Sequence, residues 1–356
     1  MATVVFNNQK NLFFRSLKEK VDTYFENNNI SAYGNKKLYV KSILQITSAA
    51  IIYGTLVFFT PILPVSIVLC CLLGLNLAVI GFNVMHEGGH ASFSKYAWIN
   101  KASAYFLNVM GGNSYYWKIK HNINHHTFTN VEGMDSDIDI KPFMRLHKGQ
   151  PRYWMHQFQH IYFVVFYGLA YFSWIFYDDF VKYFSGKISA TYVNQKLSFK
   201  EHLIFWMTKK FYIGIYIIIP IFMVGLLKAL IGFAIVSFVC GFAIAIVFQL
   251  AHIVENTEFP VVQDGDTKIE QQWAIHQVNT TSDFATKSKL ISWLLGGLNF
   301  QVEHHLFPKI SHVHYPAINR MVKATCLEFN INYNEYPTFL KAIGSHLHHI
   351  KKMGKA

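Results

Sequence analysis

Charged side chains are scarce in this chain, which argues against an ordinary soluble protein. Only 15% of the 356 residues are charged, whereas 52% are hydrophobic and 17% are aromatic; soluble domains carry about 25% charged residues. Much of the hydrophobic sequence falls into four runs, each close to the roughly 20 residues needed to cross a hydrocarbon core. These runs are 43–60, 65–85, 211–227 and 230–251. We therefore expect an integral membrane protein.

Cysteine is also sparse, with four residues in the chain. Cys70, Cys71 and Cys240 lie in predicted spans, and Cys326 lies in the C-terminal part. The spacing shows no disulfide framework. We interpret the four residues as small buried hydrophobic side chains.

Acidic residues are outnumbered: 20 Asp and Glu against 32 Lys and Arg give a net charge of +12. The basic residues gather before the first and third runs, whereas 61–64 carries no charge and only Lys228 lies between the last two runs. The positive-inside bias predicts that both termini and segment 86–210 are cytoplasmic. This placement argues against a nucleic-acid partner. Residues 1–41 are polar, so we expect a cytoplasmic N-terminal segment and no cleavable signal peptide.

Histidine, in contrast, is abundant, and seven histidines fall in three short motifs near the ends of apolar runs. The motifs are His86-Glu-Gly-Gly-His90, His121-Asn-Ile-Asn-His125-His126 and Gln301-Val-Glu-His304-His305. Imidazole suits iron, copper, zinc or nickel. Because seven nitrogens are too many for one ion, the motifs predict a two-metal site at a membrane surface.

The spacing within the motifs supports this prediction. Residues i and i+4 share one face of an α-helix, so His86 can point with His90, and His121 with His125. His126 is rotated by about 100° from His125, so adjacent histidines suggest ligands for two neighbouring metals. The first motif also matches the HExxH pattern of zinc proteases. That alternative needs one zinc and leaves the other two motifs unexplained.

The order of the motifs constrains the topology. If the second and third motifs share one membrane face, an even number of crossings must separate them, yet three apolar segments lie there. The segment 161–177 is short, aromatic-rich and bounded by polar residues, so we expect it to lie in the interface. The predicted fold is an all-α integral membrane protein. It has four transmembrane helices in two hairpins, an interfacial helix, and a cytoplasmic helical cap that holds the metal site.

Residues 42–345 form the predicted membrane domain, and residues 346–356 form a C-terminal tail. The tail contains His346, His348 and His349 with lysines behind them. A solvated terminus is the simplest interpretation of this segment.

Several further residues are candidates for the site. His252 ends the fourth span, and an ionisable residue at membrane depth is a functional candidate. Gln301 either coordinates weakly or hydrogen-bonds a metal-bound water, and His276 is a weaker ligand candidate. Carboxylates near a metal commonly accept the second N–H of a ligating histidine. The candidates for that role are Glu87, Glu303, Asp135, Asp137 and Asp139, with a solvated acidic loop as the alternative for the three aspartates.

The basic residues near the second motif are Lys118, Lys120, Lys141 and Arg145. They either bind phosphates of a carrier or lipid headgroup, or simply make this face basic. His312 and His314 follow the third motif closely, and we expect them to support the ligands or to lie at the surface.

With these motifs the chain resembles the membrane-bound fatty-acyl desaturases. HEGGH is similar to the first histidine box of that family (H-D/E-x-x-H), HNINHH to the second (H-x-x-x-H-H) and QVEHH to the third. Glutamine at the start of the third box resembles the front-end branch, and GGLNFQVEHHLFPKISHVHYP looks like bacterial members of it. The resemblance extends from about Ser42 to Tyr336.

The resemblance implies a non-haem di-iron centre that uses O2 and two electrons to leave a cis double bond in an acyl chain. It implies an acyl-CoA or acyl-lipid substrate in a narrow tunnel beneath the metals, and an active site on the cytoplasmic face, as in a bacterial inner membrane. The implied iron ligands are His86, His90, His121, His125, His126, His304 and His305, together with His252, which matches an additional histidine that the family places before the third box.

Many eukaryotic front-end desaturases carry a fused cytochrome b5 domain with an HPGG motif, which this sequence lacks. We therefore expect electrons from a separate ferredoxin or cytochrome b5, and a basic cytoplasmic face would suit an acidic donor. Two other functions stay open on the sequence alone. One is a hydroxylase on the same scaffold, and the other is a non-enzymatic metal transporter.

Overall fold

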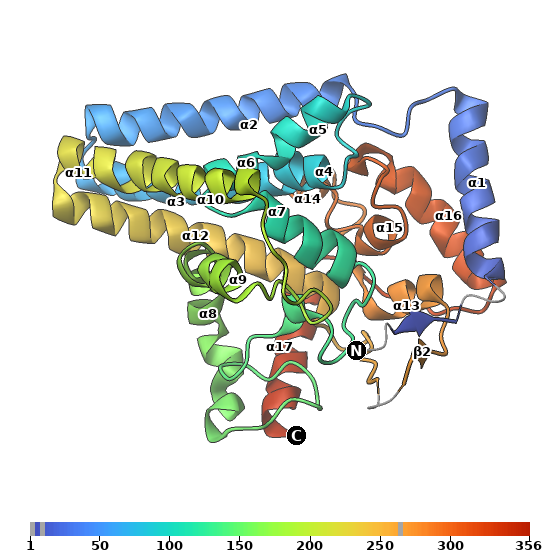
Figure 1. The fold of residues 1–356 in the computed structure, drawn as a ribbon. Helices are drawn as coiled ribbons and strands as arrows, with labels where there is room; N and C mark the ends of the chain where they lie inside the picture. The colour runs from blue at the N-terminus through green and yellow to red at the C-terminus, as the bar shows by residue number, and fades with distance from the viewer. Residues whose placement is uncertain (1–3, 8–10, 263–265) are drawn as a thin grey trace.

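Helices make up nearly all of the regular structure (Figure 1). The computed structural model describes residues 4–7, 11–262 and 266–356. In chain order the α-helices are α1 (Leu12–Asn28), α2 (Lys36–Gly54), α3 (Leu63–Ile80), α4 (His86–Gly89), α5 (Ala97–Ala104), α6 (Phe106–Val109), α7 (Ser114–Trp117), α8 (Gln159–Ser173), α9 (Asp179–Ser185), α10 (Phe199–Ile213), α11 (Ile219–Val224), α12 (Leu226–His252), α13 (Trp273–Thr280), α14 (Lys289–Leu294), α15 (Gln301–Leu306), α16 (Tyr315–Glu328) and α17 (Phe339–Lys355).

Short segments of other winding extend or join these helices. The π-helical segments are η1 (Thr55–Phe59), η2 (Gly81–Met85), η3 (Lys118–His125), η6 (Trp174–Asp178) and η7 (Gly214–Ile218), and the 3-10 turns are η4 (Ser136–Ile138), η5 (Trp154–Phe158) and η8 (His312–His314). Within the described ranges the strands form two parallel pairs, β1 (Val5–Phe6) with β2 (Lys268–Ile269) and β3 (Asp283–Phe284) with β4 (Glu335–Tyr336).

Five helical stretches are long and apolar enough to cross a membrane: Lys36–Phe59, Leu63–Gly89, Trp154–Ser185, Phe199–Val224 and Leu226–His252. Four of them overlap the four predicted runs. The first begins earlier than predicted because the Asn35 side chain accepts a hydrogen bond from the Leu38 N–H and caps α2. The remaining stretch contains residues 161–177, so this segment is longer than the sequence suggested.

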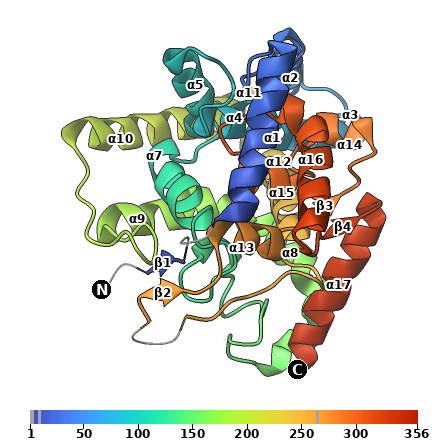
Figure 2. The same cartoon turned by 90° about the vertical axis from the view of Figure 1, so that its right-hand side faces the viewer.

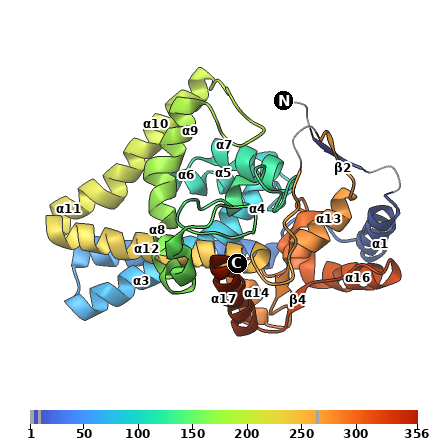
Figure 3. The ribbon, with the colours of Figure 1, turned by 90° about the horizontal axis from the view of Figure 1, so that it is seen from below.

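The helix that contains this segment runs in a different direction from the rest of the bundle. In Figure 1, α2, α3, α10–α11 and α12 extend along one direction, whereas α8 descends steeply across α12, and Figure 3 shows the same crossing from below. Small residues make the crossing close. A Cβ atom on Gly241 would lie 2.5 Å from the Gly168 carbonyl oxygen, and one on Gly168 would overlap the Phe238 ring. Glycine therefore lets the two backbones approach.

Tight turns close the helix pairs at the far end of the bundle. Residues 60–62 join η1 to α3, and Gly225 alone joins α11 to α12 with a φ of 86°. Glycine adopts this left-handed conformation without a steric penalty. The Tyr53 hydroxyl donates to the Ile215 carbonyl, 2.5 Å away, and so connects the two pairs.

At the opposite end, a second hydrophobic core joins α1, α13, α15 and α16, which Figure 2 shows from that side. Phe13, Leu17 and Val21 lie four residues apart on one face of α1 and are fully buried. Their partners include Val278 of α13 and Val322 of α16. This assembly contributes the third histidine motif.

The expectation of a solvated C-terminal tail is wrong for one face of the segment, because five of its eleven residues are buried. Helix α17 runs through the predicted boundary at 345/346. His346 and His349 are buried, and their rings bind the carbonyl oxygens of Ile253 and Leu146 at 2.7 Å. On the opposite face His348 is exposed, with 65% of its side-chain surface accessible, and so are Lys351, Lys352 and Lys355. An amphipathic helix packs one face inward. The sequence did not reveal this face because two of its residues are histidines, which suggested a solvated segment.

Candidate metal centre

A π-helix precedes the first histidine motif, and another contains most of the second. The π-helix η2 precedes His86, and the whole of Lys118–His125 is π-helical. In η3 the His126 N–H bonds to the His121 carbonyl five residues earlier, at 3.1 Å. This differs from the α-helical spacing that the sequence predicted. Such π-helical segments are rare and frequent at functional sites. Here the winding stacks the His121 and His125 rings, with centroids 5.0 Å apart.

The glycines of the first motif allow close packing around it. A Cβ atom on Gly88 would lie 2.5 Å from the Ser103 Cβ of α5, and one on Gly89 would overlap the Trp117 ring. The Asn122 amide also donates to the Gly89 carbonyl at 2.7 Å. The first and second motifs therefore lie directly against each other.

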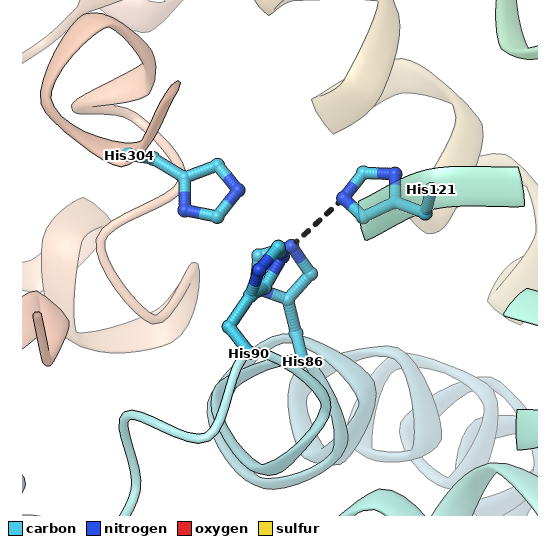
Figure 4. Close-up of side chains that lie close together, drawn as sticks. All are labelled: His86, His90, His121 and His304. Carbon is cyan, nitrogen blue, oxygen red and sulfur yellow. Dashed lines mark hydrogen bonds between the residues drawn. The ribbon is translucent and has the colours of Figure 1, made fainter. Parts of the chain in front are cut away.

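All three motifs meet in one place. The ligand atoms of His86, His90, His121 and His304 lie within 4.8 Å of one another, and Figure 4 shows their rings converging. The two Nε2 atoms of His86 and His121 are 3.3 Å apart. His304 comes from α15, more than 200 residues after His90, so the tertiary fold completes this group.

A second group lies beside the first. His125, His252 and His305 also bring their ligand atoms within 4.8 Å, and His126 forms a further group with His304 and His305. His126 thus shares one neighbour with each of the first two groups, His304 and His305 respectively. Every one of the eight predicted histidine ligands belongs to at least one group.

The nitrogens available to a metal are buried and lack hydrogen-bond partners among the described residues. This holds for the Nε2 atoms of His90, His125, His126, His304 and His305. An unpaired buried polar atom is costly, and five in one place need a common explanation. A bound metal supplies it, so the donor set fits transition-metal ions.

In four of the ligand rings, a neighbouring side chain contacts the Nδ1 atom. His125 Nδ1 lies 2.8 Å from Asp135, and His121 Nδ1 lies 3.2 Å from Asp137. His304 Nδ1 is 3.2 Å from the Tyr315 hydroxyl, and His305 Nδ1 is 2.7 Å from the Gln277 amide oxygen. Contacts of this kind fix the tautomer and direct Nε2 toward a metal.

Burial sets the protonation of the rings. It lowers the pKa of His126, His304 and His305 well below the usual value, and neighbouring imidazoles lower it further. Burial also tends to lower the pKa of His125, but the carboxylates of Asp135 and Asp137 outweigh it and raise that pKa. Most of the rings are therefore neutral, which is the form that binds metal.

Three of the five predicted carboxylates have other partners than the ligand histidines. Glu87 accepts hydrogen bonds from Ser311 Oγ at 2.8 Å and from the His312 backbone N–H and ring, at 2.8 and 2.7 Å. Glu303 binds Asn319 and Tyr333, and Asp139 pairs with Lys141 at the surface. For Glu87 and Glu303 the partners come from segments that sequence spacing cannot place, whereas the partner of Asp139 is two residues away. Glu87 joins the first motif to the turn after the third, which accounts for buried His312.

The remaining candidates also find definite positions. The Gln301 amide nitrogen lies 3.0 Å from His252 Nε2, a contact that orients this ring. His276 belongs to none of the metal-binding groups and packs against Phe6, with ring centroids 4.9 Å apart. Lys120 pairs with Asp137 at 2.8 Å. Arg145 is buried among backbone carbonyls, including that of Met353 at 2.6 Å, so it is not a phosphate ligand.

Sequence reasoning missed Gln277, Thr129 and Tyr315 as neighbours of the ligands. The Thr129 hydroxyl lies 3.2 Å from His305 Nδ1 and donates to the Gln277 oxygen at 2.8 Å. Tyr315 follows the third motif by ten residues, and this closeness in sequence was the only indication that it could contact a ligand. Gln277 and Thr129 carry no local signal at all.

Comparison with known proteins supports the arrangement. A family model described as "Fatty acid desaturase" matches residues 62–337, which include all three motifs. The chain is 34% identical over 353 residues to the sn-1 linoleoyl-lipid 6-desaturase of Arthrospira platensis, covering 96% of this chain and 92% of that protein. It is 33% identical over 354 residues to the protein of the same name from Synechocystis sp., covering 98% and 97%.

A third relative is also similar: the chain is 35% identical over 348 residues to the acyl-lipid (8-3)-desaturase of Physcomitrium patens, covering 96% of this chain and 72% of that protein. The similarity thus runs along nearly the whole chain and includes the converging histidines. The resemblance inferred from the three motifs is confirmed. The chain belongs to the fatty acid desaturase family and is a fatty-acyl desaturase, an oxidoreductase.

Proposed function

We propose that this desaturase holds two iron ions and acts on an acyl chain carried by a lipid. The observation that carries the proposal is the pair of histidine groups joined by His126. His86, His90, His121 and His304 would hold one iron. His125, His252 and His305 would hold the other, with Gln301 orienting His252.

When bound, an iron pair of this kind activates O2 with two external electrons and so allows two hydrogens to be removed from the acyl chain. The chain's own residues supply the setting for this chemistry. Neutral imidazoles bind the metals, while Asp135, Asp137, Gln277 and Tyr315 fix the rings. Burial of these groups keeps bulk water away.

An apolar cavity between the long helices suits the acyl chain. It has a volume of about 330 Å³ and is lined by residues that include Leu73, Leu77, Tyr171, Tyr212 and Val236. Leu77 and His86 lie on the same continuous helical stretch. At 1.5 Å per residue they are roughly 13 Å apart along it. The cavity would therefore receive the part of the chain beyond the bond that reacts.

We further propose four membrane crossings, with the active site on the cytoplasmic face. The second and third motifs meet in one site, so an even number of crossings must separate them, whereas three candidate stretches lie between them. The steep course of α8 across α12 favours the stretch Trp154–Ser185 as the one that stays in the interface. The basic segments then lie on the cytoplasmic side.

The names of the relatives support a lipid-linked substrate, since each of the three contains the term acyl-lipid or linoleoyl-lipid. Electrons would come from a separate carrier protein, a ferredoxin or a cytochrome b5.

The test uses purified protein in nanodiscs with a reduced ferredoxin system and O2. Metal analysis should give two irons per chain. Mass spectrometry should find a product two mass units lighter when an acyl glycerolipid is supplied, and its fragments locate the double bond. Turnover of acyl-CoA alone would reject the lipid-linked substrate, and a single zinc would reject the iron pair. A product sixteen units heavier would instead identify a hydroxylase.

A further inference from the structure

Trp117 is a partly exposed side chain in ring contact with three of the proposed iron ligands. Its indole stacks on His121, with centroids 4.8 Å apart and planes inclined by 24°. The centroids of His86 and His90 are each 5.6 Å from the indole. The side chain therefore extends from the surface to the first group of ligands.

The fold holds the indole firmly in this position. Trp117 ends α7 immediately before η3, and the absence of a side chain at Gly89 leaves room for its ring. The hydrogen bond from Asn122 to the Gly89 carbonyl, at 2.7 Å, joins the same two segments beside it. The indole is thus clamped between the first and second motifs.

No other ring in the described ranges combines these properties. Tyr315 contacts His304 but is 2% exposed. Phe248 contacts His125 and His252 and is partly exposed, but it belongs to the candidate membrane span α12. A water-soluble partner can reach Trp117 and cannot reach Phe248 across lipid.

The surface sequence around Trp117 is basic. Residues 88–131 contain four lysines, Lys95, Lys101, Lys118 and Lys120, and no aspartate or glutamate. Lys118 is exposed beside Trp117. Lys95, just before α5, and Lys101, within α5, are also exposed. Lys120 alone among the four is paired with a carboxylate, that of Asp137. The other three are available to an acidic partner.

We propose that Trp117 and Lys118 form the electron-entry site, where an acidic one-electron carrier protein docks. This inference rests on the proposed iron pair. One turnover is R–CH2–CH2–R′ + O2 + 2e⁻ + 2H⁺ → R–CH=CH–R′ + 2H2O. Two reduced carrier molecules dock in turn, and each is oxidised by one electron. The indole forms and breaks no bond, and shortens the gap between carrier and ligands. Charge complementarity at Lys118 orients the carrier and speeds its association.

The first measurement is binding of a plant-type [2Fe–2S] ferredoxin to the full-length, iron-loaded enzyme in nanodiscs. Lys118→Glu should weaken binding about fivefold at low salt, and the difference should shrink as salt screens the charges. Lys341→Glu, at an exposed lysine of α17, is the matched control and should bind as the wild type does. Equal weakening by both variants, or by neither, would overturn docking at Lys118.

The second measurement is stopped-flow reduction of the iron centre by reduced ferredoxin. Trp117→Leu should slow it about tenfold, equivalent to about 1.4 kcal/mol in the barrier, with iron content and the KM for the acyl substrate unchanged. Trp273→Leu is the control, since its partly exposed indole donates to the His126 carbonyl at 3.1 Å and makes no ring contact with the motif histidines among the described residues. It should be reduced at the wild-type rate.

Other outcomes would reject the role of Trp117. A raised substrate KM with unchanged reduction would make it part of the substrate entrance. Iron loss, or equal slowing in Trp273→Leu, would make it structural. Failure of the proposed function is distinct, because the wild-type protein would then hold no iron pair to reduce.

Discussion

Three of the ligand histidines use their two nitrogens for different tasks. In His125, His304 and His305, Nδ1 contacts a carboxylate, hydroxyl or amide, whereas Nε2 is buried without a partner among the described residues. This division separates ligands from ordinary buried histidines such as His346. There one nitrogen meets the Ile253 carbonyl at 2.7 Å and the other the Tyr167 hydroxyl at 2.9 Å. Complete pairing therefore marks a structural histidine.

His304 belongs to two of the groups, so its replacement should affect both metals. We expect His304→Ala to bind on average less than one iron per chain, because His126 and His305 lose their common neighbour. Metal analysis of the purified variant checks this. His348→Gln, at an exposed histidine, should keep the wild-type iron content. Retention of both irons in His304→Ala would remove it from the ligand set.

The aspartates after the second motif differ in their expected effects. Asp135 is buried against His125, and Asp139 pairs with Lys141 at the surface. Asp135→Asn should weaken iron binding about 10- to 100-fold, the usual cost of losing a carboxylate behind a ligating histidine. Chelator competition measures this affinity. Asp139→Asn should bind iron as tightly as the wild type does. A comparable loss of affinity in that variant would mean that negative charge near the site, and not the contact of Asp135 with His125, stabilises the bound iron.

At the scale of elements, glycine decides how closely helices approach. Gly74 of α3 would place a Cβ atom 2.6 Å from the Val236 carbonyl of α12, and the Gly168–Gly241 contact brings α8 against the same helix. Helix α12 is therefore packed tightly on two sides. Its C-terminal residue His252 can then be held beside His125, at a centroid distance of 4.7 Å.

Gly168→Ala should weaken this packing, because the added methyl group would overlap the Phe238 ring. Overpacking of this kind costs about 1–3 kcal/mol, so the variant should unfold at a lower temperature in a detergent thermal-shift assay. Gly54→Ala is the matched control, since a Cβ atom there has no neighbour within 4 Å and alanine favours a helix. If both variants unfolded at the wild-type temperature, the α8–α12 crossing would be looser than described.

At the scale of the molecule, the long helices and the helical assembly around α1 and α16 meet where the histidines gather. The stretch Leu63–Gly89 contains His86 in its last turn, and the stretch Leu226–His252 ends in His252. The site therefore lies at one end of the bundle, between two hydrophobic cores. This arrangement explains why motifs separated by more than 200 residues share one centre.

The four-crossing topology predicts that both ends of the α8 region lie on one side of the membrane. Single cysteines at Arg152 and Lys187, in a background without the four native cysteines, should react with an impermeant maleimide from the same side as a cysteine at Lys355. Labelling of oriented vesicles checks this. A cysteine at Lys228, in the opposite turn, should react only from the other side. Labelling of positions 152 and 187 from opposite sides would make α8 a crossing helix.

The sequence by itself determined the membrane class, the positions of the four apolar runs and the eight histidines that gather into groups. These features depend on local composition and on short spacings, which a chain displays before it folds. Family membership followed from the same motifs.

Tertiary structure decided which ring nitrogen of each ligand histidine contacts a neighbouring side chain. It also decided the direction of α8 and the partners of the acidic residues. Glu87 contacts His312 and Glu303 contacts Tyr333, and the segment expected to be a solvated tail belongs to helix α17. Trp117 reaches the first motif only through its tertiary contact with Gly89. Such contacts join segments far apart in the chain, and local spacing carries no record of them. Burial then gives them their energetic weight, because an unpaired polar group is costly only away from water.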